Sequence, residues 1–341
     1  MSKQEIEEIL AFYHNSSTQD LARRADTVCR MNYGNAVYLR GLIEFSNHCH
    51  SDCLYCGIRK SNDKVVRYRM SKEEILDAVR MGKDCGLKSF VLQSGEDSFY
   101  TCDLLCDIIQ AIKEITQGQA AVTLSCGIRS KQQYAQWKAV GADRYLMRFE
   151  TSDPDLHERL RHGISLKRRL QALEDLKECG YELGSGYMVG LPGETEEMRV
   201  NNALLCHKLQ LDMVGIGPFI PNQDTPLAGQ GGGSIEMTIR AVSLVRLLLP
   251  KANIPATTAA GSIDPQGREK ILQAGANVLM PNITPVLQKK NYLLYPDKIC
   301  LDEDGLKCLN CLKYRVLSIN KSISLERGDS LGIGMKNGLC E

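Results

Sequence analysis

Residues 85–93 read Cys85-Gly86-Leu87-Lys88-Ser89-Phe90-Val91-Leu92-Gln93, so a glycine ends a helix-like segment just before a short β-rich run. Glycine often ends helices because it adopts the left-handed backbone conformation without strain. The same junction recurs at Val140-Gly141-Ala142-Asp143, Cys179-Gly180-Tyr181 and Ala274-Gly275-Ala276-Asn277. Short links of this kind are typical of repeated βα units.

β-rich runs alternate with helical patterns from about residue 37 to residue 285. Eight runs are candidate strands: Val37–Phe45, Ser89–Gln93, Ala121–Ser125, Arg144–Phe149, Glu182–Val189, Met213–Pro218, Pro255–Ala259 and Asn277–Met280. Eight strands with intervening helices predict an α/β fold, a closed (βα)8 TIM-type barrel. We expect residues 1–36 to form a helical prefix, 37–285 the barrel and 286–341 a C-terminal extension. A doubly wound open sheet is the alternative.

Three segments between these runs carry helix signals. Ser71 is followed three residues later by Glu74, which is a capping-box start. The segment Leu166–Cys179 ends at Gly180, and Thr195–Leu209 is a third helical pattern. These helices fall where βα repeats require them.

The composition bounds the class of protein. The 341 residues are 43% hydrophobic and 24% charged, with a net charge of +1, so no global field favours nucleic acid or an anionic membrane. No apolar stretch reaches 18 residues, and the N-terminal residues lack a signal core. Fourteen cysteines in a chain of this length fit a reducing compartment better than a disulfide scaffold. We therefore expect a cytoplasmic protein with no nucleic-acid or membrane partner.

Three cysteines follow the first expected strand, in Cys49-His50-Ser51-Asp52-Cys53-Leu54-Tyr55-Cys56. The spacing C-x3-C-x2-C places three thiolates on one short loop. Three thiolates can hold three irons of a [4Fe–4S] cube and leave the fourth iron open to a small molecule such as S-adenosylmethionine (SAM). A zinc site lacking its fourth ligand is the plainer interpretation, although zinc frameworks usually come as paired C-x2-C knuckles.

Polar and glycine-rich residues follow the other expected strands at their C-terminal ends, where the working loops of such barrels lie. They are Gln93-Ser94-Gly95-Glu96-Asp97, Thr123, Ser125, Cys126, Arg148, Glu150, Met188, Gly190–Gly193, Gly215–Pro218, Thr257 and Thr258. Each has a simpler interpretation alone: Arg148 and Glu150 as a rim ion pair, Thr257 and Thr258 as strand residues. Their coincidence behind a three-cysteine loop favours one shared site.

Together these motifs resemble the radical SAM superfamily. Cys49, Cys53 and Cys56 match its cluster loop, and Tyr55 fills the aromatic position before the last cysteine. The segment Ser94-Gly95-Glu96 resembles the family's Gly-Gly-Glu segment, which engages the methionine amino group, with Ser94 replacing one glycine.

Longer phrases resemble the HydE maturases of [FeFe]-hydrogenase, in the biotin synthase-like group. They include Val91-Leu92-Gln93-Ser94-Gly95-Glu96-Asp97, Met188-Val189-Gly190-Leu191-Pro192-Gly193, Asp212-Met213-Val214-Gly215-Ile216-Gly217-Pro218-Phe219-Ile220-Pro221 and Ile254-Pro255-Ala256-Thr257-Thr258-Ala259. The similarity spans roughly residues 37 to 311.

This resemblance implies roles for individual residues. Glu150 would bind the ribose or methionine part of SAM, and Arg169 its carboxylate. Arg148, Ser125 and Met213 would help to form the cofactor pocket. A polar substrate cavity deeper in the barrel would be lined by Gln93, Thr123, Thr257 and Thr258.

Near the C-terminus, Cys300, Cys308 and Cys311 have the spacing C-x7-C-x2-C. They resemble an accessory iron–sulfur site of some family members, which implies a [2Fe–2S] cluster that is dispensable for the reaction. Core or unmetallated cysteines are the alternative here, and Cys340 is expected to take no part.

The resemblance also implies a reaction. A reduced cluster would cleave SAM to methionine and a 5′-deoxyadenosyl radical, which the cofactor supplies while the protein orients it and excludes water. The radical would attack the sulfur of a small organometallic, amino-acid-derived substrate, a cysteine-bound Fe(CO)2(CN) complex, in assembly of the H-cluster diiron subcluster. Expected partners are a reductant such as ferredoxin or flavodoxin and other hydrogenase maturation proteins.

Two other classes remain open from the sequence. One is a related enzyme of the biotin synthase or methylornithine synthase type, which shares the barrel and the cysteine triplet. The other is a non-catalytic iron–sulfur carrier or zinc-stabilised scaffold, which would show no change at the reduced cluster when SAM is added.

Overall fold

The computed structural model describes residues 1–302 and 305–332, and the side chains of residues 305–308 lie outside this description. Six parallel strands form one sheet in the order β2-β3-β4-β5-β6-β7. Their bounds are β2 Gly41–Ser46, β3 Ser89–Ser94, β4 Ala121–Ser125, β5 Arg144–Leu146, β6 Glu182–Val189 and β7 Met213–Pro218. The expected α/β fold with a parallel sheet is confirmed, because each neighbouring pair in this sheet is parallel.

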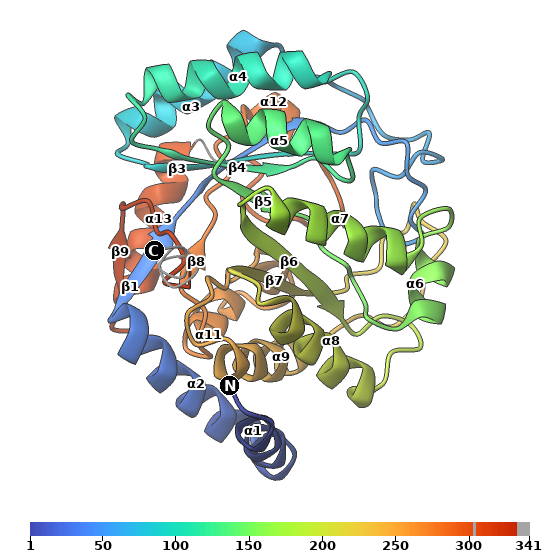
Figure 1. Cartoon of the computed structure of the whole chain (residues 1–341), viewed down its shortest axis with the longest axis vertical. Coiled ribbons are helices and arrows are strands. Elements are labelled where there is room, and N and C mark those ends of the chain that lie inside the picture. Colours follow the sequence, from blue (N-terminus) through green and yellow to red (C-terminus); the bar gives the residue numbers. More distant parts are fainter. Residues whose placement is uncertain (303–304, 333–341) are drawn as a thin grey trace.

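A second, three-stranded sheet has the order β8-β1-β9. It contains β1 Ala36–Leu39, β8 Val278–Leu279 and β9 Ser322–Ser324, so the chain's C-terminal segment lies beside its first strand (Figure 1). Single parallel bridges join Met213 to Asn253, Pro255 to Val278 and Leu42 to Asn282. The segments that carry Asn253, Pro255, Val278 and Asn282 therefore lie between β7 and β2.

Two of the eight expected strands, Arg144–Phe149 and Asn277–Met280, are shortened to β5 and β8, and two others differ more strongly. The run Val37–Phe45 divides at Arg40 into β1 and β2, which pair in different sheets, and Arg40 directs its guanidinium to Gly328 at the N-terminal end of the strands. The run Pro255–Ala259 forms only a single bridge at Pro255, which has no N–H to donate to a ladder. Thr257 then caps a helix, because its hydroxyl accepts from Ala260 N at 3.4 Å.

Helices surround the strands (Figure 1). Their bounds are α1 Lys3–Asn15, α2 Thr18–Tyr33, α3 Lys72–Asp84, α4 Cys102–Ile115, α5 Lys131–Ala139, α6 Pro154–Leu160, α7 Leu166–Glu178, α8 Glu196–Leu209, α9 Ile235–Leu248, α10 Thr258–Ile263, α11 Gly267–Leu272, α12 Val286–Lys289 and α13 Gly305–Leu317. The capping box at Ser71 and Glu74 is present, and α7 ends before Gly180 at φ +77°. All eight residues of β6 are buried, as expected for a strand covered on both faces.

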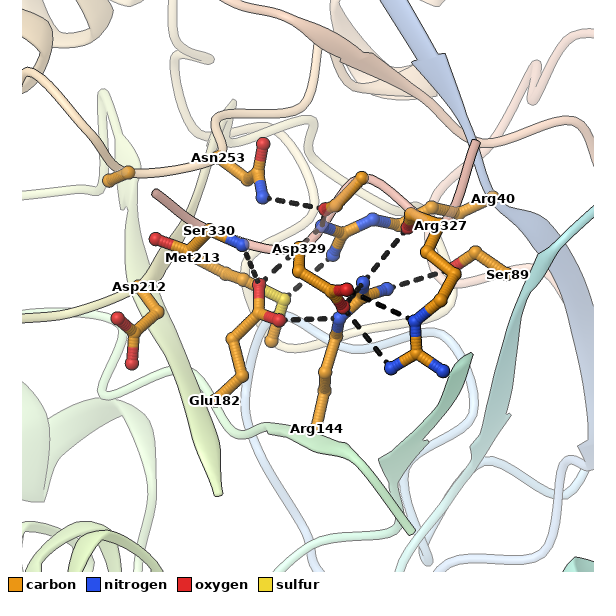
Figure 2. Close-up of polar contacts among 12 residues, drawn as sticks. Arg40, Ser89, Arg144, Glu182, Asp212, Met213, Asn253, Arg327, Asp329 and Ser330 are labelled. Carbon is orange, nitrogen blue, oxygen red and sulfur yellow. Dashed lines mark hydrogen bonds and ion pairs between the residues drawn. The ribbon is translucent and has the colours of Figure 1, made fainter. Parts of the chain in front are cut away.

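Charged side chains are buried at the N-terminal ends of the strands. Arg144 and Glu182 lie there with Arg40 (Figure 2). Residues 327–330 cross this end, where Gly328 O accepts from Arg40 Nη2 at 3.1 Å and from Asn253 Nδ2 at 2.9 Å. Residues 327–330 therefore cover the N-terminal ends of the strands.

None of the helices in the described ranges combines the length and apolar character that a membrane-spanning segment requires.

Candidate functional site

A cavity of about 320 Å³ lies at the C-terminal ends of the parallel strands. The six strands of the larger sheet reach it through Glu44, Gln93, Ser125, Leu146, Met188 and Gly217. Ligands bind at this end of parallel α/β folds because loops from separate strands converge there. Residues 292–300 of the expected C-terminal extension contribute a further wall. The site is thus built from most of the chain.

Cys49, Cys53 and Cys56 all line the cavity, as free thiols on the loop after β2. Backbone contacts fix this loop: Leu54 N donates to Leu160 O at 2.9 Å and Gly57 N to Leu294 O at 2.8 Å. A Cβ added to Gly57 would lie 2.1 Å from Leu293 O, so only glycine allows this close approach. The expected grouping of the three cysteines is therefore present.

The donor chemistry of the loop fits an iron–sulfur cluster. Glu96 N donates to Cys49 Sγ at 3.3 Å, which would stabilise a thiolate there. Burial raises the pKa of the Cys49 and Cys56 thiols, and the neighbouring cysteines raise it further, whereas a bound metal would favour their thiolate forms. Among the described residues, no group of three His, Cys, Asp or Glu side chains is placed to hold a single metal ion.

Glu96 is the centre of the charges in the cavity. Its Oε1 lies 3.3 Å from Arg169 Nη1 and 3.4 Å from Arg161 Nη2, and its Oε2 lies 3.4 Å from His50 Nε2. Burial lowers the pKa of Arg169, as does the adjacent charge of Arg161. Two desolvated guanidiniums held by one carboxylate form a ready site for the carboxylate and ammonium of a bound amino acid.

Glycines on two loops give the Glu96 side chain its space. A Cβ on Gly127 would lie 2.2 Å from Glu96 Cγ, and Gly127 also has φ +77°. A Cβ on Gly95 would lie 2.2 Å from His48 O, next to the cysteine loop. The loops after β2, β3 and β4 can therefore meet at Glu96 only with glycine at these positions.

The expected pair Arg148 and Glu150 also lies at the cavity, with Arg148 Nε 3.3 Å from Glu150 Oε1. Glu150 has φ +70°, a strained conformation for a non-glycine residue. Its buried Oε2 has no hydrogen-bond partner among the described residues. Strain together with an unsatisfied buried acceptor indicates a ligand-binding residue more than a simple rim ion pair.

Most of the other expected residues also line the cavity. They are Tyr55, Ser94, Gly95, Ser125, Gln93, Thr257 and Thr258. Gln93 Nε2 donates to Tyr292 OH at 3.3 Å on the wall. Thr257 and Thr258 reach the cavity from the start of α10, not from a strand.

Two expected residues lie elsewhere. Met213 begins β7 at its N-terminal end, where Arg40 Nη1 donates to its sulfur at 2.7 Å (Figure 2). The geometry therefore does not support a cofactor role for Met213. Thr123 is buried and does not line the cavity, although its hydroxyl has no partner among the described residues.

Several cavity residues were not expected from the sequence. Arg161 is one, and it carries no local motif because it contacts Glu96 from 65 residues away. Glu44 and Lys298 are others, paired at 2.6 Å, with Glu44 Oε2 accepting from Asn282 Nδ2 at 2.7 Å. A lone carboxylate in the apolar run of β2 was the available signal for Glu44.

The second cysteine set is only partly described. Cys300 has φ +64° and lines the cavity, and Cys311 is exposed on α13. The side chain of Cys308 and the whole of Cys340 lie outside the described part of the chain. The accessory site stays a prediction.

The chain is similar in sequence to proteins of a known family. A sequence model of the radical SAM superfamily matches residues 43–206. The [FeFe] hydrogenase maturase subunit HydE of Thermotoga maritima is 47% identical over 311 residues, which cover 91% of this chain and 88% of the relative. The chain belongs to the HydE family of radical SAM proteins. Membership of the superfamily implies a [4Fe–4S] cluster and SAM as its cofactors.

Methylornithine synthases are similar to the chain at lower sequence identity. The 3-methylornithine synthase of Methanosarcina acetivorans is 28% identical over 281 residues, 82% of this chain and 79% of the relative. The crystal structure of a methylornithine synthase superposes with a TM-score of 0.81 at 25% identity, covering 94% of each chain. The chain therefore shares its fold with a methylornithine synthase.

Proposed function

We propose that this chain is an [FeFe]-hydrogenase maturase that holds a [4Fe–4S] cluster through Cys49, Cys53 and Cys56. The observation that carries the proposal is that these thiols, Glu96 and Glu150 line one cavity in a chain 47% identical to a HydE subunit. The cluster and SAM, when bound, supply reductive cleavage to a 5′-deoxyadenosyl radical.

The side chains at Glu96 would orient SAM. Glu96 carries a carboxylate for the methionine ammonium, and Arg169 beside it suits the methionine carboxylate. The Oε2 of Glu150, which has no hydrogen-bond partner in the described part of the chain, could accept from a ribose hydroxyl or the methionine ammonium. Ser94, Gly95 and Ser125 complete this part of the wall.

The substrate would lie deeper in the cavity than SAM, closer to the strands. Gln93, Thr257 and Thr258 provide neutral polar groups there for an amino-acid-derived ligand, while Arg148, paired with Glu150, would stay part of the cofactor pocket. We propose that this ligand is a cysteine-bound Fe(CO)2(CN) complex, which the radical would attack at sulfur. The chain's part is to orient this ligand and to exclude water and other hydrogen donors.

We further propose that the two sheets form one closed (βα)8 barrel. The three single bridges through Asn253, Val278 and Asn282 support closure, because they connect β7 to β2 around the ring. Residues 327–330 would seal its N-terminal end. A closed lumen suits a reactive radical because it excludes competing groups.

Three assignments extend this function. Cys300, Cys308 and Cys311 would hold an accessory [2Fe–2S] cluster. The electron would come from a reductant such as ferredoxin or flavodoxin, and the product would pass to other maturation proteins.

A hydrogenase activation assay tests the function. Apo-hydrogenase is matured in a defined mixture with this protein present or omitted. We expect activity only when it is present, and equal activity in both mixtures would overturn the assignment. Parallel assays with lysine and dethiobiotin test the methylornithine synthase and biotin synthase alternatives, of which the first is favoured by the structural superposition.

A further inference from the structure

Arg161 connects two parts of the site that are far apart in the sequence. It follows α6, and its side chain is 6% exposed. Its Nη1 donates to Tyr55 OH at 3.2 Å and its Nη2 to Glu96 Oε1 at 3.4 Å. One guanidinium therefore contacts both the cysteine loop and the carboxylate that we assign to SAM.

The backbone beside Arg161 makes a second contact with the same loop. Leu54 N donates to Leu160 O at 2.9 Å. Leu54 and Tyr55 are the two residues between Cys53 and Cys56, so the end of α6 holds both of them. Figure 1 shows the blue loop after the first strands lying beside α6.

The surroundings of Arg161 leave its charge poorly screened. Arg169 shares Glu96 with it, and Glu150 is the other nearby carboxylate. His157 is buried, with its pKa lowered to about 4 by burial and by the two arginines, so it is neutral. A desolvated cation acts strongly on thiolates beside it because little solvent screens it.

We propose that Arg161 is a positioning residue that couples Glu96 to the cysteine loop. Ligand binding at Glu96 would then change the position of the guanidinium relative to Cys53 and Cys56. The inference rests on the proposed function, because the ligand in question is SAM. Arginine suits this role since its planar fork reaches two acceptors at once, whereas lysine presents a single point charge.

The test measures two properties of the anaerobically reconstituted full chain: the midpoint potential of the cluster, by EPR-monitored titration, and the Kd for SAM, by calorimetry. We expect Arg161→Gln to move the potential to a more negative value and to weaken SAM binding on the order of tenfold, the loss typical of a hydrogen bond to a charged group. Arg161→Lys should keep the potential near the wild-type value and still weaken SAM binding.

Tyr55→Phe removes the hydrogen bond from Arg161 to the cysteine loop and leaves the charge of Arg161 in place. It should weaken SAM binding in the wild-type protein and have no further effect in the Arg161→Gln background, because the route through Arg161 is already lost. If the two effects add in full, Arg161 does not act through Tyr55 and the proposal is wrong. Should Arg161→Gln fail to take up iron, the same cycle is measured in the Arg161→Lys background, and an effect of Tyr55→Phe on the Kd that adds in full there would overturn the proposal.

Arg168→Gln is the matched control, since Arg168 is a half-exposed cation on α7 whose charge change is the same. An equal change in this control would show an effect of net charge alone and overturn the inference. Wild-type protein that binds neither cluster nor SAM would refute the proposed function instead, so the two failures are distinguishable.

Discussion

Arg144 Nε lies 2.6 Å from Glu182 Oε2, and both side chains are almost fully buried between neighbouring strands β5 and β6 (Figure 2). Arg144 Nη2 also lies 2.6 Å from Asp329 Oδ1 on the C-terminal segment. Burial, followed by the charge of Arg144, lowers the pKa of nearby Arg40 to about 9. Two buried cations thus depend on one buried carboxylate and one half-exposed carboxylate.

Glu182→Gln should therefore destabilise the protein strongly. It leaves Arg144 and Arg40 without their buried counter-charge, and breaking a buried pair typically costs about 3–5 kcal/mol. Asp329→Asn should cost only about 1 kcal/mol, because solvent already screens a carboxylate that is 44% exposed. Urea unfolding measures both values.

Glu326→Gln on the same segment is the control. Its carboxylate is 72% exposed and pairs with exposed Lys88, so the free energy of unfolding should not change. Equal losses for Glu182→Gln and Glu326→Gln would contradict a special role of the buried pair.

His157 should make the protein acid-sensitive. Its folded pKa of about 4 lies below the ordinary value of 6.5, and neither ring nitrogen has a partner among the described residues. The unfolded chain therefore binds a proton that the folded chain does not, and stability falls as pH drops from 6.5 toward 4, by at most about 3 kcal/mol. His157→Phe should flatten the unfolding free energy across this window. His162→Gln, at an exposed histidine, should leave the slope as it is.

Glu150→Gln should weaken SAM binding by roughly tenfold, because it removes the charge of a buried carboxylate whose Oε2 has no partner within residues 1–302 and 305–332. Calorimetry with SAM measures the change. Glu158→Gln on the exposed face of α6 is the matched control. An unchanged Kd for Glu150→Gln would remove this residue from the SAM site.

Replacing Cys308 and Cys311 together by alanine should lower the iron content of the protein and spare SAM cleavage. The reason is that the accessory cluster is assigned outside the reaction. Iron analysis and 5′-deoxyadenosine formation are the two measurements. Complete loss of cleavage would show that the second site is essential.

Local signals in the sequence predicted much of the fold. β4, β6 and β7 have the bounds expected for them, because each is a run of strand-forming residues between turn or helix signals. The division at Arg40 was not predictable, since it depends on a guanidinium that contacts Gly328 from 288 residues away. The loss of the strand at Pro255–Ala259 had a local cause, Pro255 followed by a capping Thr257, which the β-branched residues concealed.

The candidate site divides in the same way. The three cysteines lie on one loop, so their spacing alone was enough to predict that they share one site. Arg161 and the wall at residues 292–300 come to the cavity through tertiary packing, and no spacing pattern marks them. Met213 was misplaced because it begins β7, whereas the cavity lies two to four residues further along the same face, at Gly215 and Gly217.

The central claim is that three thiolates hold a cluster that cleaves SAM. The most direct measurement is 5′-deoxyadenosine formed from SAM by anaerobically reconstituted, reduced protein, wild type against Cys53→Ala. We predict formation by the wild-type protein and none by the variant. Continued formation by Cys53→Ala, or a colourless and iron-free wild-type protein after reconstitution, would contradict the account.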